Sequence, residues 1–455
     1  MTTNARDIAV LALRDRMGNV TARLESLLGQ SPLPAADRAL ARELALGTAR
    51  RRRTLETVLR SFLKQPGRKL PGALHEILLV ALYQILFLDR VPDFAAVNEA
   101  VEQAAAHHHK RQSGLVNGVL RTVTRKISEA ADGRVAKSPE VIPISPGRFR
   151  TSQQPVFPDP AEDAAAYLAA AHSLPSALAK RWVDRYGLDK AVQLGFHANA
   201  RPPLILRVNA LKADVQSVLA SLSDEGVSAR AHSNAASVVV DGYVNVEELG
   251  AFRDGLVQPQ DPTATAVGAK ALPRPGQAAL DFCAAPGTKT THLAELMDNR
   301  GSIVAVDVDE AKLAKVRSNC ERLGISIVST LPADQAGSLE PQGFDVVLAD
   351  VPCTGTGVLA RRAEARWRFD EQRLGKIVQD QRLIAKAAAH FAGPGKTFVY
   401  STCSIEPEEC QQVAKWLTRE QSNLTLVDEK LTLPSGTEDP TQWHDGGYCA
   451  VFRSS

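Results

Sequence analysis

Two cysteines follow the ends of predicted strands. Cys353 comes directly after a proline and Cys403 directly after a threonine. The apolar runs that precede them, Phe344–Ala349 and Thr397–Ser401, are typical of buried strands. A single cysteine is most often a small buried hydrophobic residue. Two thiols at neighbouring strand ends instead indicate a shared site, in which a thiolate could act as a nucleophile.

A strand that turns into a helix lies upstream of these cysteines. The run Ala278–Phe282 predicts a strand, Pro286 and Gly287 break it, and Thr290–Met297 predicts a helix. Such a turn presents free backbone N–H groups at the place where open α/β sheets bind nucleotide-like ligands. The turn has one glycine and no G-x-G-x-x-G pattern, so we do not expect it to hold a pyrophosphate. S-adenosylmethionine has no phosphate and is the expected ligand.

Acidic residues lie at or just after the ends of three predicted strands. Asp307 lies about 20 residues or slightly more after the glycine turn, where a carboxylate can accept hydrogen bonds from both ribose hydroxyls. Asp334 and Asp350 follow the next two strands. Strands alternate with helices at βαβ spacing, which predicts a Rossmann-like parallel sheet with all these side chains at one edge. Leu424–Val427 and Tyr448–Phe452 would add an antiparallel hairpin to the sheet.

One reaction requires a thiolate beside a methyl donor. C5 of a pyrimidine is too weak a nucleophile to attack a sulfonium methyl, but a thiolate that adds at C6 makes C5 enamine-like. After methyl transfer a base removes the C5 proton, and elimination releases the thiol. Asp350 could stabilise the adduct through N3 or the exocyclic amine. Lys289 and the arginines at 361, 362 and 366 could hold phosphate or the reacting base.

The positive charge is concentrated in the first 130 residues. They carry 20 Lys and Arg against 12 Asp and Glu, a net charge of +8, whereas the remainder has a net charge of −5. This distribution indicates a polyanionic partner, although a solvated helical surface would look similar. The Arg50–Arg53 cluster suits phosphate contact, or alternatively the dipole of a helix end. Apolar spacing predicts helices at Ala5–Leu28, Ala35–Arg53, Leu55–Lys64, Gly72–Leu88, Phe94–His107 and Gly114–Lys126.

The rest of the chain divides by composition. Gly133–Pro160 holds six prolines and few large apolar residues, which predicts an extended linker. A small α+β module follows it, in which Arg207 and Asn209 would share one strand face and either line a groove or lie on the surface. The expected segments are 1–130 (helical), 131–173 (linker), 174–256 (α+β module) and 257–455 (Rossmann-like sheet).

Several classes of protein are not expected. No secretion signal or membrane span is predicted, because the longest apolar stretch, Ile77–Leu88, is too short and contains a glutamine. Six cysteines without a C-x-x-C pair indicate reduced thiols in the cytoplasm. The run at residues 107–109 consists of three histidines without ligand partners at metal spacing, so we expect no metal site. A monomer is expected.

The motifs together resemble a known family. Residues 281–290, 350–357 and 400–405 read Asp-Phe-Cys-Ala-Ala-Pro-Gly-Thr-Lys-Thr, Asp-Val-Pro-Cys-Thr-Gly-Thr-Gly and Tyr-Ser-Thr-Cys-Ser-Ile. They resemble the motifs of the Nop2/Sun RNA cytosine-5 methyltransferases. Residues 206–212 resemble a short motif that this family carries ahead of its sheet. Residues 91–121 are similar to the helical RNA-binding domain of the antitermination factor NusB. The pairing implies an enzyme that forms 5-methylcytosine in the 16S rRNA of the small ribosomal subunit.

The resemblance also implies roles for individual residues. Cys403 would be the nucleophile and Cys353 would assist product release, whereas spacing alone favours Cys353, because DNA cytosine methyltransferases use the Pro-Cys motif. Asp350 would contact both the cytosine and the cofactor. Thr288 departs from the family, which usually has glycine there. The implied cofactor-binding residues are Cys283, Ala284, Ala285, Pro286, Gly287, Thr288, Lys289, Asp307, Asp334 and Asp350.

Two other functions compete with this interpretation. A methyltransferase with the same chemistry could act on tRNA. A non-catalytic, NusB-like RNA-binding factor could retain a relict sheet, but it would be expected to lose Asp307, Asp350 or Cys403, and all three are present.

Overall fold

The computed structural model describes residues 4–14, 20–67, 69–106, 112–242 and 244–455. The chain divides into two compact units. The first unit contains residues 1–200 and 359–370, and the second contains residues 201–358 and 371–455. The histidine run at 107–109 lies outside the described residues. Among the residues that are described, no helix is long and apolar enough to cross a membrane.

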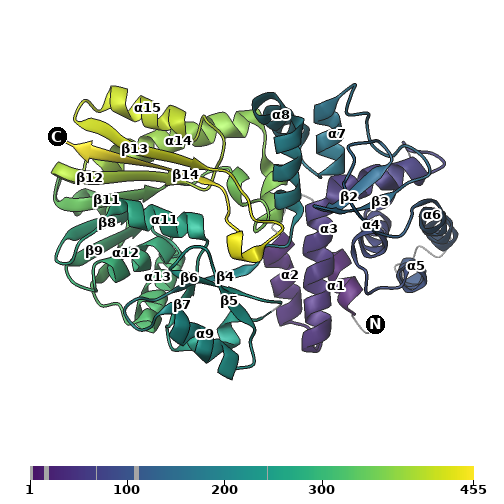
Figure 1. Ribbon diagram of the computed structural model, residues 1–455, viewed down its shortest axis with the longest axis horizontal. Helices are drawn as coiled ribbons and strands as arrows, with labels where there is room; N and C mark the ends of the chain where they lie inside the picture. The colour runs from purple at the N-terminus through teal and green to yellow at the C-terminus, as the bar shows by residue number, and fades with distance from the viewer. Residues whose placement is uncertain (1–3, 15–19, 68, 107–111, 243) are drawn as a thin grey trace. The chain divides into compact units, whose positions relative to one another are not determined.

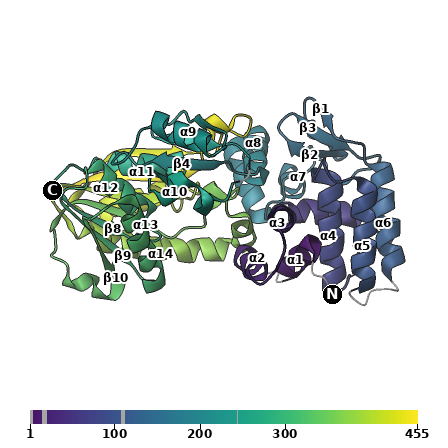
Figure 2. The same ribbon diagram turned by 90° about the horizontal axis from the view of Figure 1, so that it is seen from below.

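Helices dominate the first unit, as the sequence predicts. Figure 2 shows α4, α5 and α6 side by side. Helix α4 is buried on nearly all sides, because its sequence is almost entirely apolar, and it forms the centre of the core. The one helix expected over residues 5–28 is described as α1 and α2. The helices are α1 Ala5–Leu13, α2 Val20–Gly29, α3 Ala35–Phe62, α4 Gly72–Phe87, α5 Asp93–Ala104, α6 Ser113–Lys126, α7 Ala164–Ala171 and α8 Ser176–Asn199.

The proline-rich segment differs from the extended linker that its composition predicts. It forms a small antiparallel sheet of strands β1 (Ala131–Asp132), β2 (Val141–Ser145) and β3 (Arg148–Thr151) in the order β1-β3-β2. Three of its apolar residues, Ile142, Val156 and Phe157, are buried in the helical core. The composition is misleading because a few apolar side chains are enough to anchor the segment when neighbouring helices supply the core.

The arginine cluster at residues 50–53 lies inside α3, which runs unbroken where two helices were expected. Arg51 is buried and donates to the carbonyl oxygens of Pro143 (3.1 Å) and Ile144 (2.5 Å). Arg52 pairs with Glu76, and Arg53 donates to the carbonyl of Leu174. The phosphate-contact hypothesis is therefore wrong for these three side chains, and so is the helix-end alternative.

Residues 359–370 interrupt the second unit along the sequence, but they pack with the first unit. Arg366 is fully buried there, and its guanidinium donates to the carbonyl oxygens of Arg50, Ser173 and Ala198, among others. Trp367 donates its indole N–H to the carbonyl of Ala49 at 3.0 Å. Arg366 is thus a structural residue, and the expectation that it holds phosphate or a base is wrong.

The second unit opens with a four-stranded antiparallel sheet in the order β5-β6-β4-β7. Arg207 and Asn209, at the end of β4, are fully buried, so they neither line a groove nor lie on the surface. Asn209 donates to the carbonyl oxygens of Gly255 and Leu323. The elements are β4 Leu204–Val208, α9 Val215–Asp224, β5 Ala229–Ala231, β6 Ser237–Val240, α10 Gly250–Arg253 and β7 Val257–Pro259.

The main sheet has seven strands in the order β10-β9-β8-β11-β12-β14-β13. The first five are parallel, and β14 pairs antiparallel with both β12 and β13, which confirms the predicted Rossmann-like sheet with an edge hairpin. Figure 1 shows α11, α12 and α13 on one face and α14 and α15 on the other. The strands are β8 Ala278–Phe282, β9 Ser302–Asp307, β10 Val328–Pro332, β11 Phe344–Asp350, β12 Ala392–Thr402, β13 Leu424–Thr432 and β14 Gly447–Ser454, and the helices are α11 Pro262–Ala271, α12 Thr288–Leu296, α13 Glu310–Leu323, α14 Glu371–Ala389 and α15 Gln411–Glu420.

Candidate active site

The carboxyl ends of the five parallel strands bring the predicted site residues to one edge of the sheet. Asp350 is the last residue of β11, and it lies opposite Ser401 of the adjacent strand β12. Cys403 follows β12 directly, and Cys353 follows the end of β11 after Val351 and Pro352. Parallel strands end on the same side, so residues about 50 positions apart become neighbours.

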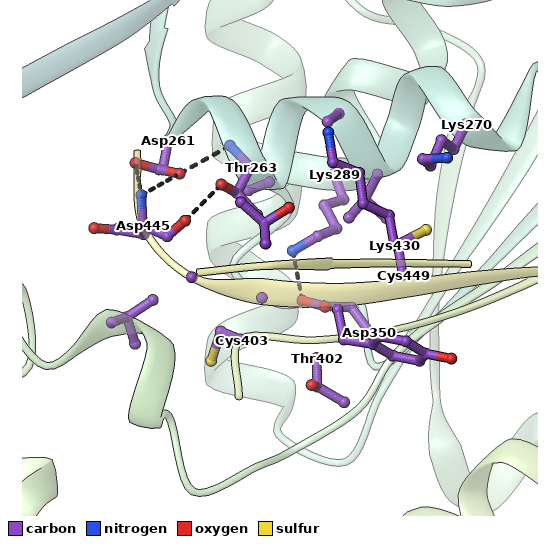
Figure 3. A pocket seen from close by; sticks show the side chains of 18 residues that line it. Asp261, Thr263, Lys270, Lys289, Asp350, Thr402, Cys403, Lys430, Asp445 and Cys449 are labelled. Atoms are coloured by element: carbon purple, nitrogen blue, oxygen red, sulfur yellow. Dashed lines mark hydrogen bonds and ion pairs between the residues drawn. The ribbon is translucent and has the colours of Figure 1, made fainter. Parts of the chain in front are cut away.

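A pocket of about 620 Å³, which includes space open to solvent, lies at this edge. Figure 3 shows Lys289, Asp350 and Cys403 among its lining side chains. The hairpin β13–β14 closes one side with Lys430, and α11 contributes Lys270. The sequence interpretation missed these two lysines, because nothing near them in the sequence marks a site and only the edge hairpin brings Lys430 to the pocket.

Lys289 and Asp350 form a partly buried ion pair in this pocket. The Lys289 Nζ lies 2.6 Å from Asp350 Oδ2, and the Ser401 hydroxyl donates to Asp350 Oδ1 at 2.6 Å. Burial by itself would lower the pKa of Lys289, but the charge of Asp350 and the hydrogen bond to it outweigh that effect and raise the pKa. Both oxygens of Asp350 are therefore held in place by donors, and Lys289 stays cationic.

The two candidate thiols lie in contact. Cys353 Sγ and Cys403 Sγ are 3.0 Å apart, and both side chains are partly exposed. The hydrogen bond to Cys403, together with burial, raises the pKa of Cys353 well above its ordinary value. Cys353 is therefore held as a thiol when Cys403 carries a negative charge. Such an S–H group can donate to the Cys403 thiolate.

The turn after β8 contacts the acid at the end of β9. Asp307 Oδ2 accepts a hydrogen bond from the backbone N–H of Ala285, and Oδ1 accepts one from the backbone N–H of Asp309, both at 3.1 Å. Gly287 adopts φ 97° at the start of α12, and a Cβ there would lie 3.1 Å from the backbone of Val316. Glycine is required by both the positive φ and this close approach.

The remaining residues predicted to bind the cofactor lie in or near this turn. Burial raises the pKa of the Cys283 thiol to about 12, so this cysteine is an inert thiol. Thr288 is the first residue of α12, and its carbonyl accepts a hydrogen bond from Arg207. Asp334 is exposed on a 3₁₀ helix (Ala333–Ser338) that follows β10 and contacts β9.

Asp281, on β8 beneath the turn, is a further candidate that was not singled out from the sequence. Its Oδ2 accepts from the Thr290 hydroxyl at 2.6 Å, whereas its buried Oδ1 has no partner among the described residues. Burial raises the pKa of Asp281 to about 7. The signal in the sequence is an acid inside an apolar strand, which carries a cost unless a partner is supplied.

Comparisons with known proteins assign the chain to a family. Residues 270–445 match the family model described as 16S rRNA methyltransferase RsmB/F, residues 3–125 match the NusB family, and residues 174–247 match the ferredoxin-like domain of RsmF/B-like methyltransferases. This last match starts two residues before α8 and includes the whole of that helix, which belongs to the first unit.

Relatives span nearly the whole chain. A probable ribosomal RNA small subunit methyltransferase B from Bacillus subtilis is 31% identical and covers 90% of this chain and 87% of that protein. The ribosomal RNA small subunit methyltransferase B of Sodalis glossinidius is 33% identical over 90% of this chain and 87% of that protein. The crystal structure of PH0851 covers 99% of both chains with a TM-score of 0.76 at 23% identity, a likeness of fold. The chain therefore belongs to the RsmB/F family of 16S rRNA methyltransferases.

Proposed function

We propose that this chain uses S-adenosylmethionine to form 5-methylcytosine in 16S rRNA through a covalent bond between a cysteine and C6 of the cytosine. The observation that carries the proposal is the pair of thiols 3.0 Å apart beside the Lys289–Asp350 ion pair. Methylation of C5 needs a thiolate nucleophile, a group that stabilises charge on the ring, and a group that assists release. The pocket edge supplies a residue for each need.

The residues around the turn after β8 fit S-adenosylmethionine. Asp307 and Asp334 follow neighbouring strands, as ribose and adenine contacts require, and residues 283–289 would hold the methionine end. The unpartnered, buried Oδ1 of Asp281 fits a site that a ligand completes by bringing a hydrogen-bond donor. When bound, the cofactor supplies an electrophilic methyl group.

Cys403 is the nucleophile in this proposal. It lines the pocket, and the negative charge of its thiolate is among the causes that raise the pKa of Lys289, so the two groups stabilise each other. The Cys403 sulfur forms a bond to C6, and the Asp350 carboxylate accepts a hydrogen bond from the exocyclic amine of the cytosine. The ammonium of Lys289 holds Asp350 in place while this charge develops.

Cys353 assists the release of the product. While Cys403 is an anion, its charge and hydrogen bond keep Cys353 protonated. Once Cys403 is bound to C6 it carries no charge, so the pKa of Cys353 falls and its thiolate becomes available as a base. Removal of the C5 proton then allows the Cys403–C6 bond to break, which regenerates the Cys403 thiolate.

An RNA substrate is supported by charge and by family. Lys270, Lys289 and Lys430 all line the pocket. The family match of residues 3–125 is to NusB, and the first 130 residues carry a net charge of +8. The relatives named as small-subunit rRNA methyltransferases favour 16S rRNA over tRNA. Action in the cytoplasm as a monomer stays a prediction.

The two thiols can be separated by substitution. With a 16S rRNA fragment and the cofactor, Cys403→Ala should give no 5-methylcytosine by bisulfite sequencing and no covalent complex. Cys353→Ala should still attack C6 but release slowly, leaving a protein–RNA adduct that survives denaturing electrophoresis. Cys320→Ala, on α13, is the control and should methylate without an adduct. An adduct that accumulates in Cys403→Ala and is absent in Cys353→Ala would make Cys353 the nucleophile.

A further inference from the structure

The segments that carry the two cysteines meet on one buried carboxylate. Glu409, just before α15, is fully buried. Its Oε1 accepts from the backbone N–H of Thr354 at 2.8 Å, and its Oε2 accepts from the hydroxyls of Thr354 and Ser404. Thr354 directly follows Cys353, and Ser404 directly follows Cys403. One carboxylate therefore joins the residues next to both thiols.

A fourth donor completes the arrangement. The side-chain amide of Gln381 donates to Glu409 Oε1 at 3.0 Å and also to the carbonyl of Pro352 at 2.9 Å. Pro352 directly precedes Cys353, so Gln381 ties the Cys353 segment to the same carboxylate. The Tyr400 hydroxyl donates to the backbone carbonyl of Glu409 at 2.7 Å, which fixes its main chain to β12.

The cost of burying Glu409 is not offset by a cation. Among the described residues it has no ion-pair partner, and burial raises its pKa although its hydrogen bonds oppose the rise. A buried carboxyl group with only neutral donors stabilises a fold poorly compared with an apolar side chain of the same size. The arrangement instead restricts geometry, because four donors from three segments converge on two oxygens.

We propose that Glu409 is a positioning residue that sets the distance between the Cys353 and Cys403 thiols by holding the two segments on one carboxylate. Its catalytic meaning rests on the proposed function, but the geometry can be tested without RNA. The negative charge of Glu409 is also among the causes that raise the pKa of Cys353, after the larger effects of Cys403 and burial. Glu409 thus acts on Cys353 both through position and through charge.

Oxidative cross-linking of the full-length chain measures the thiol distance directly. Diamide takes up the two thiol hydrogens as the Sγ–Sγ bond forms, and mass spectrometry of the linked peptides gives the rate. We expect the wild type and Glu420→Gln, which removes an exposed acid at the end of α15, to cross-link at the same rate. Glu409→Ala should cross-link roughly tenfold to a hundredfold more slowly, as the loss of buried hydrogen bonds implies.

Smaller changes keep the test decisive if Glu409→Ala fails to fold. Thr354→Val removes one hydroxyl donor on the Cys353 side, and Ser404→Ala removes the donor on the Cys403 side. Each should slow cross-linking by a smaller factor than Glu409→Ala. Wild-type rates in Thr354→Val, Ser404→Ala and any folded Glu409 variant, or no cross-link in the wild type, would overturn the proposal.

A second readout separates positioning from a general loss of stability. In Glu409→Gln, binding of S-adenosylhomocysteine measured by calorimetry should equal that of the wild type, while the RNA adduct should accumulate because Cys353 no longer assists release. Equal losses in ligand binding, attack and release would indicate a merely structural role and refute positioning. If cross-linking slows as expected but no variant ever forms an RNA adduct, the inference about geometry stands and the covalent mechanism fails.

Discussion

Arg207 offers the sharpest test of how the second unit is held together. Its guanidinium is fully buried and donates from Nε to Glu295 at 3.0 Å and from an Nη atom to the other Glu295 oxygen at 2.6 Å. The other N–H groups reach Gln260, the carbonyl of Thr288 and the hydroxyl of Thr291. The small antiparallel sheet and the first helix after the cofactor turn are therefore joined by one cation.

The substitution Arg207→Met keeps the length of the side chain and removes the charge. It leaves Glu295 buried without a cation, and the loss of one partner of a buried pair costs about 3–5 kcal/mol. Burial raises the pKa of Glu295, and Arg207 opposes that rise. Without Arg207 the pKa of Glu295 rises further. The variant therefore loses stability as the pH rises through this raised pKa and Glu295 becomes charged. The deficit in stability against the wild type should therefore grow as the pH rises and shrink as the pH falls.

Hydrogen exchange read by mass spectrometry is the suitable assay, because it follows the second unit separately from the first. Peptides that cover β4 and β8 should lose protection in Arg207→Met and recover much of it in Arg207→Met/Glu295→Leu, which removes both charges. Arg230→Met is the matched control, because its ion pair with Asp241 is solvent-exposed and should contribute little to stability. Additive losses in the double variant, or a deficit that does not depend on pH, would refute the reasoning.

Three further predictions concern the site. Asp307→Ala should weaken binding of S-adenosylmethionine about tenfold to a hundredfold by calorimetry, since a charge-assisted bond contributes roughly 1.5–3 kcal/mol, and unchanged affinity would remove Asp307 from the site. Asp281 has its folded-state pKa raised from 3.8 to about 7, so its contribution to stability is lost as pH rises through that window, by up to about 4 kcal/mol. Asp281→Asn should flatten this decline in denaturant unfolding. Lys430→Ala should lower RNA affinity and reduce the salt slope by about 0.7–0.9 if Lys430 contacts one phosphate, whereas an identical slope would exclude that contact.

The sequence by itself determined the sheet and the edge where the site lies. The strands at Ala278–Phe282 and Phe344–Ala349 and the closing hairpin were predicted to within a few residues, because the period of apolar residues is a local property. The meeting of Cys353 and Cys403 followed from topology, since parallel strands present their carboxyl ends on one side. Their roles in catalysis stay predictions.

Only the tertiary structure decided whether the charged and proline-rich segments are buried or exposed. The sequence alone is compatible with phosphate contact by Arg51, Arg207 and Arg366. Each of these guanidinium groups is instead buried and donates hydrogen bonds to oxygen atoms of distant segments. Whether an arginine lies in solvent or in a core depends on those acceptors, and no local pattern records them. The same holds for residues 133–160, where Ile142, Val156 and Phe157 are buried only because helices from elsewhere supply the core.

Glu409 shows the same limit at the active site. It lies in the run Glu406-Pro407-Glu408-Glu409, which gives no sign that Glu409 is buried, and its donors come from segments up to 55 residues away. The spacing of residues along the sequence predicts which groups meet at strand ends, because parallel strands are regular and end on the same side of the sheet. It cannot locate a group whose role depends on irregular segments that meet in three dimensions, since their path is set by packing and not by period.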